Sequence, residues 1–270
     1  MPLSIRNVQK VYGSNGTAIT AVDNVSLEIA DGQFISLIGP SGCGKSTLLS
    51  MIAGFDAVSA GTITGIGQPA MVFQEAALFP WRTIRDNVAF GLQMRGMGKA
   101  ERRERAEEAL RMVHLGRFAN SYPHELSGGM RQRAAIARAL VIDPGVLLMD
   151  EPFGALDAQT RSLLQGELLS VWEHTHKTVV FVTHSLEEAL SLSDRVILMS
   201  ARPGRVLGDF VVDAPRPRDL ADPVLASLRT RLMDLLTTEV NKVAQAEMDA
   251  DWHGSGRVIP AAGDNIGAEI

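Results

Sequence analysis

The sequence predicts an α/β protein with a mostly parallel sheet, and two observations support that prediction. Four short runs are apolar on both faces, as buried parallel strands are. They are residues 34–38, 146–149, 179–182 and 196–199. Helical patterns lie between them, at residues 46–52 and 158–175. Strand alternating with helix is typical of a parallel sheet that helices cover on both faces.

Two segments depart from this alternation. Residues 1–30 carry alternating apolar and polar positions, as in 21–29, and therefore predict antiparallel strands. Residues 90–140 are helical in pattern and rich in charge, most of all at 99–111. We interpret this second segment as a small helical subdomain inserted between Gln74 and the strand that begins at Val146.

Helix-capping patterns locate two further helices. Ser185 with Glu188 three positions later forms a capping box after the strand at 179–182. Asp222 followed by Pro223 starts a helix in the last part of the chain. One face of that helix is expected to be apolar, with Val224, Leu225, Leu228, Leu232, Leu235 and Leu236 on it. After Met248 we expect a tail without regular structure.

Composition excludes several classes of protein. The chain has 270 residues and a formal net charge of -5, so it lacks the basic character of a nucleic-acid-binding domain, and no nucleic-acid partner is expected. Its single cysteine, Cys43, excludes an internal disulfide framework and favours a reducing compartment. The N-terminus shows no secretory signal, and no apolar run is long enough for a membrane helix.

A glycine-rich segment between the first buried strand and the helix after it matches the phosphate-binding pattern G-x-x-x-x-G-K-[ST]. The segment consists of Gly39, Pro40, Ser41, Gly42, Cys43, Gly44, Lys45, Ser46 and Thr47. Its backbone N–H groups and the helix N-terminus favour phosphate. Lys45 can reach the β- and γ-phosphates, and the Ser46 hydroxyl can coordinate Mg²⁺. The segment predicts a nucleoside triphosphate site; Cys43, with no partner base or metal in view, is interpreted as filler in it.

Two carboxylates follow the strand at 146–149, at the edge where open α/β sheets bind ligands. Asp150 suits Mg²⁺, directly or through water, and Glu151 is placed to act on the attacking water as a general base. Alone, an Asp-Glu pair at a strand end is a weak signal. Together with the phosphate loop upstream it indicates a P-loop nucleotide hydrolase core.

A third motif lies between these two and identifies a family. Ser127, Gly128 and Gly129, in Leu-Ser-Gly-Gly-Met, start a helix. Here the sequence resembles the ATP-binding cassette (ABC) ATPases, whose signature is LSGGQ, over about residues 3–207. The resemblance implies an aromatic stack on adenine for Tyr12 and a contact with Mg²⁺ or the attacking water for Gln74. It implies a dimer-facing loop ending in Asp157, and a γ-phosphate contact for His184.

The resemblance also implies how the protein works. ATP held by the phosphate loop of one subunit is also bound by the signature of the other, so Ser127 and Gly129 act in trans and the ATPase functions as a dimer, expected here to be a homodimer. Implied partners are integral-membrane permease subunits and, indirectly, a solute-binding protein. The expected location is peripheral, on the cytoplasmic face of the inner membrane. The expected domains are a cassette at 1–207 and a helical extension with its tail at 208–270.

Three stretches resemble importers for nitrate, sulfonates and taurine: residues 78–81, 153–158 and 201–205. Phe79, Pro80 and Trp81 form an apolar cluster in a loop, so we predict that it receives a helix of the membrane subunit; an aromatic staple within the fold is the alternative. The signature ends in Met130 instead of Gln, and we expect activity to survive. Gln74 follows Lys45 by only 29 positions, which is short compared with related cassettes. We therefore predict a trimmed β hairpin around residues 61–67.

Three other functions stay open on the sequence. An exporter ATPase would have the same chemistry with a different membrane partner. A soluble ABC ATPase of DNA repair or translation is usually larger, with coiled-coil insertions or two cassettes, and this chain has neither. A nucleotide sensor without catalysis would not need Glu151, so that residue argues against the third.

Overall fold

A six-stranded sheet forms the centre of the computed structural model, which describes residues 2–13 and 18–254. Five strands are parallel and the sixth, β9, pairs antiparallel with β8 at one edge. In spatial order they are β5 (Pro69–Val72), β6 (Val146–Asp150), β7 (Thr178–Val182), β3 (Phe34–Ile38), β8 (Arg195–Met199) and β9 (Val206–Val211). The structure thus confirms the four buried strands that the sequence predicts.

A smaller antiparallel sheet contains the N-terminal strands. Its order is β2-β1-β4, with β1 at Leu3–Tyr12, β2 at Ile19–Ile29 and β4 at Ala60–Thr64. Antiparallel strands within residues 1–30 are therefore confirmed. Where a trimmed hairpin is expected, the structure has the single strand β4, and four residues lead from it into β5. Gly65 permits the close passage there, because a Cβ at this position would lie 1.9 Å from the carbonyl oxygen of Pro2.

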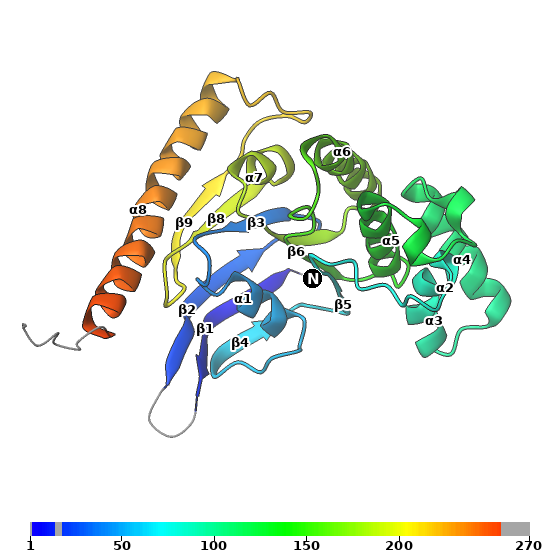
Figure 1. Ribbon diagram of the computed structural model, residues 1–270, viewed down its shortest axis with the longest axis horizontal. Helices are drawn as coiled ribbons and strands as arrows, with labels where there is room; N and C mark the ends of the chain where they lie inside the picture. The colour runs from blue at the N-terminus through cyan, green and yellow to red at the C-terminus, as the bar shows by residue number, and fades with distance from the viewer. Residues whose placement is uncertain (1, 14–17, 255–270) are drawn as a thin grey trace, which may run out of the picture.

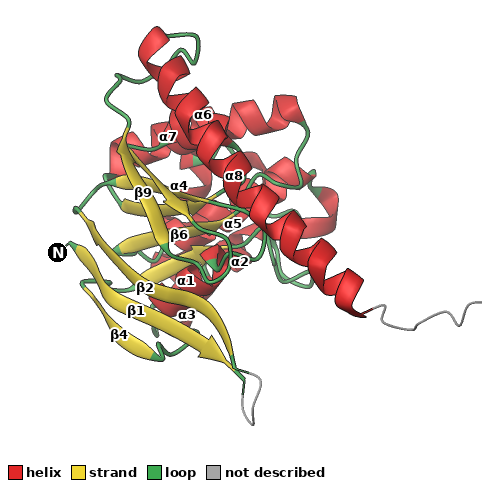
Figure 2. Cartoon of the chain, turned by 90° about the vertical axis from the view of Figure 1, so that its left-hand side faces the viewer, coloured by secondary structure: helices red, strands yellow, loops and turns green. Residues whose placement is uncertain are grey.

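The main sheet is covered on both faces, and the two-residue period of its strands decides which side chain serves which face. Val146 and Leu148 point towards helix α1 (Lys45–Ile52) and the antiparallel sheet. Leu147 and Met149 point the other way, into the cluster formed with the helices beyond. Figures 1 and 2 show α1 between the two sheets, while α6 (Ala158–Thr175) and α7 (Leu186–Leu192) cover the opposite face.

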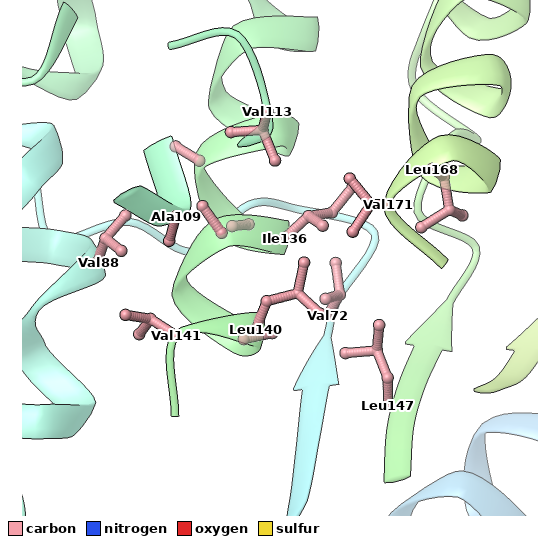
Figure 3. Packing of buried hydrophobic residues seen from close by; sticks show 14 of the residues in the cluster. Val72, Val88, Ala109, Val113, Ile136, Leu140, Val141, Leu147, Leu168 and Val171 are labelled. Atoms are coloured by element: carbon pink, nitrogen blue, oxygen red, sulfur yellow. The ribbon is translucent and has the colours of Figure 1, made fainter. Parts of the chain in front are cut away.

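The helical subdomain begins earlier than residue 90. It contains α2 (Ile84–Val88), α3 (Phe90–Met94), α4 (Lys99–Met112) and α5 (Gly128–Leu140), with 3₁₀ turns at Gly116–Phe118 and Pro123–Glu125. Thr83 fixes the start, because its side chain accepts a hydrogen bond from Asp86 N–H at 3.2 Å and so caps α2. Figure 3 shows how this subdomain joins the core: Ile136 of α5 lies among Val72, Val171 and Val113.

The predicted capping box at Ser185 is only half formed. The Ser185 hydroxyl accepts from Glu188 N–H at 3.3 Å, which caps α7 as expected. The carboxylate of Glu188 does not return to the cap residue. It is buried and accepts a hydrogen bond from Thr183 Oγ1 instead, so it joins the segment that follows β7 to the helix behind it.

The last helix, α8 (Pro223–Gly254), begins as predicted, with Val224 N–H donating to the carboxylate of Asp222 at 2.9 Å. Leu225 and Leu232 are buried against α7 and β8, and Figure 1 shows α8 along that side of the sheet. The buried face of α8 is narrower than the apolar face predicted from the sequence, however. Val224 is 69% exposed and Leu235 38%, since both lie at the margin of the stripe.

Two further expectations concern the C-terminal part. The predicted boundary at residue 207 falls inside β9, a strand of the main sheet, so we propose that the cassette continues through Val211. The expectation of an irregular tail directly after Met248 is wrong for residues 249–254, because α8 runs to Gly254; residues 255–270 lie outside the described residues. No helix in the described part of the chain is both long enough and apolar enough to cross a membrane.

Candidate active site

Neighbouring strand ends bring the candidate residues together. In the sheet, β6, β7 and β3 lie side by side and run parallel. Asp150 and Glu151 come at the end of β6, His184 follows β7, and the phosphate loop follows β3. The carboxyl ends of parallel strands share one edge of the sheet, which is where ligands bind in open α/β folds. The order of the strands in the sheet therefore places these residues close together.

The phosphate loop is held against β2 by a close backbone contact. Gly44 has φ +97°, and a Cβ there would lie 2.8 Å from the carbonyl oxygen of Ala21, so only glycine fits. Lys45 is 7% exposed and donates hydrogen bonds from Nζ to the carbonyl oxygens of Gly39, at 2.8 Å, and Pro40, at 3.0 Å. The ammonium group is thus positioned inside the loop before any phosphate arrives.

Ser46 and Asp150 bring two side-chain oxygens together at this edge. The Ser46 hydroxyl donates to Asp150 Oδ1 at 3.0 Å, although the residues come from different elements, α1 and β6. Burial raises the pKa of Asp150, and the neighbouring charge of Glu151 acts in the same direction. Hard oxygen ligands in small number suit Mg²⁺, which completes its shell with water and substrate phosphates. Among the described residues, no cluster of three or more His, Cys, Asp or Glu forms an alternative metal site.

Glu151 and His184 contact each other. The His184 Nδ1 atom lies 3.2 Å from Glu151 Oε2, and both side chains are partly exposed to the site. Glu151 adopts φ +45°, a left-handed conformation that is uncommon for a residue with a long side chain. Its backbone N–H donates to the carbonyl oxygen of Val182 at 3.0 Å, which fixes that conformation across β6 and β7. The arrangement can hold a carboxylate ready to accept a proton.

A hollow of about 400 Å³ opens beside the phosphate loop. Tyr12 lies at its margin, 40% exposed, and donates from its hydroxyl to Asp56 Oδ2 at 2.9 Å. Burial, followed by this hydrogen bond to Asp56, raises the pKa of the Tyr12 hydroxyl. The hollow is lined by Tyr12, Ile19, Ala21, Ser41, Gly42, Cys43, Gly44, Lys45, Ser46, Thr47, Glu151 and Arg202.

Cys43 in that loop is completely buried, and burial raises the pKa of its thiol. Its side chain belongs to a buried cluster that includes Val22 and Met199, and its carbonyl oxygen lies against Gly204. A buried thiol with a raised pKa is a poor nucleophile, since the thiolate is the reactive form. The geometry agrees with the interpretation of Cys43 as part of the packing of the loop.

The remaining candidates lie apart from this hollow. Gln74 and Gly128 line a second hollow that shares no residue with the first, and the Gln74 amide lies against Gly154. Ser127 is exposed and caps α5, accepting from Met130 N–H at 3.3 Å. Asp157 caps α6, accepting from Gln159 and Thr160 N–H groups at 3.1 and 3.0 Å. Within one chain the structure brings the phosphate loop, Asp150, Glu151 and His184 together, but not these residues.

Gly129 of the signature segment has a packing role. A Cβ at this position would lie 2.6 Å from the Cγ2 atom of Thr160 in α6, so glycine lets α5 and α6 approach. Gly128, by contrast, is exposed at the helix start. The two glycines therefore have different environments. Gly128 leaves the N-terminus of α5 accessible to solvent, and Gly129 allows this end of α5 to pack closely on α6.

Sequence reasoning missed Arg202 as a site residue. It lines the first hollow with Lys45 and Ser46, although the stretch 201–205 served only as a marker of importer subtype. The signal that could have found it is its place directly after the buried strand at 196–199. Only the strand order, with β8 next to β3, shows that this strand end belongs to the site.

Comparison with known proteins decides the family. A model of the ABC transporter family matches residues 22–154. An uncharacterized ABC transporter ATP-binding protein of Methanocaldococcus jannaschii is 46% identical over 248 residues, covering 89% of this chain and 93% of that protein. The chain belongs to the ABC transporter ATPase family.

Further likenesses agree with this assignment. A protein of Rhizobium johnstonii named taurine import ATP-binding protein TauB is 48% identical over 237 residues, covering 82% of this chain and 90% of that protein. The ATP-binding cassette MJ0796, solved as a dimer in a post-hydrolysis state with ADP and Pi, superposes with a TM-score of 0.69 at 35% identity, over 79% of this chain and all of that one. The fold and the ATPase activity expected of an ABC cassette are thereby confirmed.

Asp150 allows a test of the electrostatics of this ABC site without nucleotide. Because burial raises its pKa, the ionised carboxylate is disfavoured in the folded state, and this cost is present above the folded pKa and disappears as pH falls through it. We expect Asp150→Asn to raise Tm at pH 7.5 by about 2 °C, a gain that shrinks towards pH 4.

Differential scanning calorimetry of the nucleotide-free protein measures this change. Asp213→Asn is the matched control, because Asp213 is an exposed carboxylate outside the site, and its Tm should not move. A lower Tm for Asp150→Asn at pH 7.5 would show that the ionised carboxylate stabilises the fold, against this account.

Proposed function

We propose that this chain powers the import of a small organic solute of the taurine, sulfonate or nitrate type, as an ATPase subunit that hydrolyses ATP between two copies. The observation that supports this most is the meeting of the phosphate loop, Asp150, Glu151 and His184 at three adjacent strand ends. That edge supplies a phosphate cradle, two side-chain oxygens for a metal ion and a carboxylate base.

The residues divide the chemistry among them. Lys45 exchanges the carbonyl oxygens of Gly39 and Pro40 for the β- and γ-phosphates of ATP. Ser46 and Asp150 would hold Mg²⁺, which neutralises charge on the phosphates when it is bound. Glu151 accepts a proton from the attacking water.

The other groups orient the reaction. His184, 3.2 Å from Glu151, orients that carboxylate and donates towards the γ-phosphate. Tyr12, at the margin of the hollow, stacks on adenine. Gln74 lines a separate hollow, and its proposed contact is with the metal or the attacking water.

A second copy of the chain would complete the site. Ser127 and Gly128 are exposed at the N-terminus of the thirteen-residue helix α5, where backbone N–H groups and the helix dipole favour an anion. In their own chain they lie in or beside a hollow that shares no residue with the nucleotide hollow. We propose that this helix start, with Ser127 and Gly129 as expected and with the exposed Gly128 between them, binds the γ-phosphate of ATP held by the partner. The cassette MJ0796 was solved as a dimer with ADP and Pi, which supports the proposal.

The importing direction has its support in the relatives. Several proteins at 42–48% identity are named taurine import ATP-binding protein TauB, and they align over more than four fifths of this chain. An exporter ATPase would use the same nucleotide chemistry, so the partner surface is the part that separates the alternatives. We therefore assign the membrane partner as an importer-type permease pair with a solute-binding protein, which would keep the ATPase at the cytoplasmic face of the membrane.

An aromatic cluster supports a partner surface. Phe79 packs edge-to-face on Phe90 with ring centroids 4.8 Å apart, and Asn87, which is completely buried, fixes the loop by accepting from Phe79 N–H at 2.7 Å. Trp81 also lies against Phe79, with ring centroids 5.6 Å apart, but it is 73% exposed. Phe79 and Phe90 therefore form the half-buried part of the aromatic cluster, and most of the Trp81 surface remains available for a partner. We propose that Trp81 contacts a helix of the permease.

Reconstitution with the permease and the solute-binding protein tests the proposed function. We expect solute-loaded binding protein to raise ATP hydrolysis, and Trp81→Ala to lose most of that stimulation, about fivefold or more, because a central aromatic contact of about 1–2 kcal/mol is removed. ATP hydrolysis by the isolated subunit should be unchanged. Val224→Ala, which removes an equally exposed apolar side chain from α8, is the control.

Two outcomes would contradict these proposals separately. Full stimulation and full assembly of Trp81→Ala with the permease would exclude Trp81 from the partner surface. Absence of any stimulation by the solute-loaded binding protein in the wild-type complex, with ATP hydrolysis intact, would exclude the importer assignment.

A further inference from the structure

A fourth strand end lies next to the three that build the nucleotide site. Strand β8 pairs in parallel with β3 on the side away from β7, with Leu37 opposite Ile197 and Ile38 opposite Leu198. The segment that follows β8 therefore emerges beside the phosphate loop, at the same edge of the sheet. It consists of residues 200–205, and we refer to it as the β8–β9 loop.

The β8–β9 loop is fixed by its own hydrogen bonds. The Ser200 hydroxyl donates to the carbonyl oxygen of Pro203 at 2.8 Å and accepts from Arg205 N–H at 2.9 Å. Ser200 N–H also donates to the carbonyl oxygen of Arg205 at 2.9 Å, which closes the base of the loop. Hydrogen bonds within the loop thus define its conformation.

The same loop touches the phosphate loop directly. Gly204 N–H donates to the carbonyl oxygen of Ala21, and its own carbonyl accepts from Asp23 N–H, both at 2.9 Å. A Cβ at Gly204 would lie 1.9 Å from the carbonyl oxygen of Cys43, so the two backbones are in contact. Any shift of the β8–β9 loop would therefore be transmitted to the phosphate loop.

One charged side chain of this loop faces the nucleotide hollow without a partner. Arg202 lines that hollow together with Lys45, and its Nη2 atom lies 3.6 Å from where a Cβ on Gly42 would be. In the described chain, no hydrogen bond or ion pair engages the guanidinium of Arg202. Arg205, three residues on, forms an ion pair with Asp23 at 2.6 Å and points elsewhere. The fixed loop therefore presents one free guanidinium at the edge of the phosphate site.

Helix α8 holds the loop from the other side. Glu239 is 4% exposed and accepts a hydrogen bond from Ala201 N–H at 2.8 Å through Oε2. Its other oxygen pairs with Lys242, one turn further along the helix. A carboxylate this buried is rare without a charged partner and hydrogen bonds. Glu239 has both: Lys242 is its charged partner, and its other oxygen accepts the hydrogen bond from Ala201, the residue directly before Arg202.

We propose that Arg202 binds the phosphates of the nucleotide held by its own chain, and that Glu239 of α8 positions it through the backbone of Ala201. A guanidinium forms strong charge-assisted hydrogen bonds with phosphate oxygens and keeps its charge at all physiological pH values. This inference rests on the proposed function, because it requires that the hollow holds a nucleotide. Under this proposal α8 contacts the ATP site indirectly, through Ala201 and Arg202.

Equilibrium binding of ATP, ADP and adenosine to purified full-length protein tests the role of Arg202. We expect Arg202→Ala to weaken ATP and ADP binding about tenfold, the loss of one charge-assisted contact that is partly solvated, and to leave adenosine binding unchanged. Arg202→Lys should recover part of the loss. Arg229→Ala, which removes the same charge from an exposed position of α8, should bind all three ligands as the wild type does.

The result that would overturn the proposal is equal ATP affinity for Arg202→Ala and wild type. Arg202 is exposed and supports no other side chain, so its variants should keep the Tm of the wild type without nucleotide. Equal weakening for adenosine would also contradict it, because a phosphate contact cannot affect a ligand without phosphate. Failure of the proposed function would give a different result. The wild type itself would not bind ATP, and the Lys45→Ala variant would have the same ATP affinity as the wild type.

A double-mutant cycle tests the positioning role of Glu239. Glu239→Ala should weaken ATP binding about threefold without affecting adenosine, and the double variant Arg202→Ala/Glu239→Ala should be no weaker than Arg202→Ala alone. That pattern is expected only if Glu239 acts through Arg202. Additive losses in the double variant would mean that α8 affects the phosphate loop independently, and the positioning claim would fail.

Discussion

Replacing Glu151 by glutamine should lower the rate of ATP hydrolysis about 10²–10⁴-fold, the usual contribution of a general base, and leave ATP binding intact. The structure gives the reason. Glu151 lies at the end of β6 inside the nucleotide hollow, with one carboxylate oxygen 3.2 Å from His184. An amide keeps the shape and the left-handed backbone at this position, but it cannot accept a proton from water.

Steady-state phosphate release and equilibrium ATP binding, measured on the same preparation, check this expectation. Glu187→Gln is the matched control: Glu187 is a carboxylate on α7, about half exposed, and it contacts Arg229 and not the nucleotide hollow. Its hydrolysis rate should equal that of the wild type. A Glu151→Gln variant that still hydrolyses ATP within a factor of a few of the wild-type rate would remove Glu151 from the role of base.

Replacing Lys45 by alanine should weaken ATP binding about 100-fold, since two hydrogen bonds from a charged donor are lost at about 1.5–3 kcal/mol each, less the solvent that replaces them. Lys45 is almost completely buried and already oriented by two carbonyl oxygens of its own loop, so little conformational entropy is lost when phosphate replaces them. Preorganisation of this kind is what makes the contribution large.

Isothermal titration with ATP and with adenosine measures the effect. Adenosine should bind Lys45→Ala as it binds the wild type, because the lost contacts are to phosphate. Lys45→Met, which keeps most of the apolar stem, should lose as much ATP affinity as the alanine variant while matching the wild-type Tm more closely. If the methionine variant retained ATP affinity near that of the wild type, the charge of Lys45 would not be what binds the phosphates.

Much of the fold could be predicted from the sequence because its signals are local. The four central strands are apolar on both faces, and the caps at Ser185 and Asp222 are short-range hydrogen bonds that the local sequence indicates. The departures depend on distant neighbours. The carboxylate of Glu188 turns from its expected cap towards Thr183, and the segment that predicts a hairpin becomes the single strand β4, since only β1 offers it a pairing edge.

The part of the candidate site that follows the buried strands could also be predicted from the sequence. Phosphate loop, Asp150, Glu151 and His184 each follow a recognisable buried strand, so their meeting needs only the rule that parallel strand ends share an edge. Arg202 could not be found this way, because its place in the site depends on β8 lying next to β3, a matter of strand order that no local pattern records. The packing of Gly129 on Thr160 likewise depends on how two helices approach.

The central claim is that two copies of this chain bind each ATP together, since the helix start at Ser127 and the nucleotide hollow lie apart in one chain. Sedimentation equilibrium of the Glu151→Gln variant with Mg²⁺ and ATP, alone and with the permease subunits, tests it most directly. We predict a dimer with ATP and a monomer with ADP. A variant that binds ATP fully and yet stays monomeric at high concentration, and occurs as a single ATPase copy on the permease, would contradict the account.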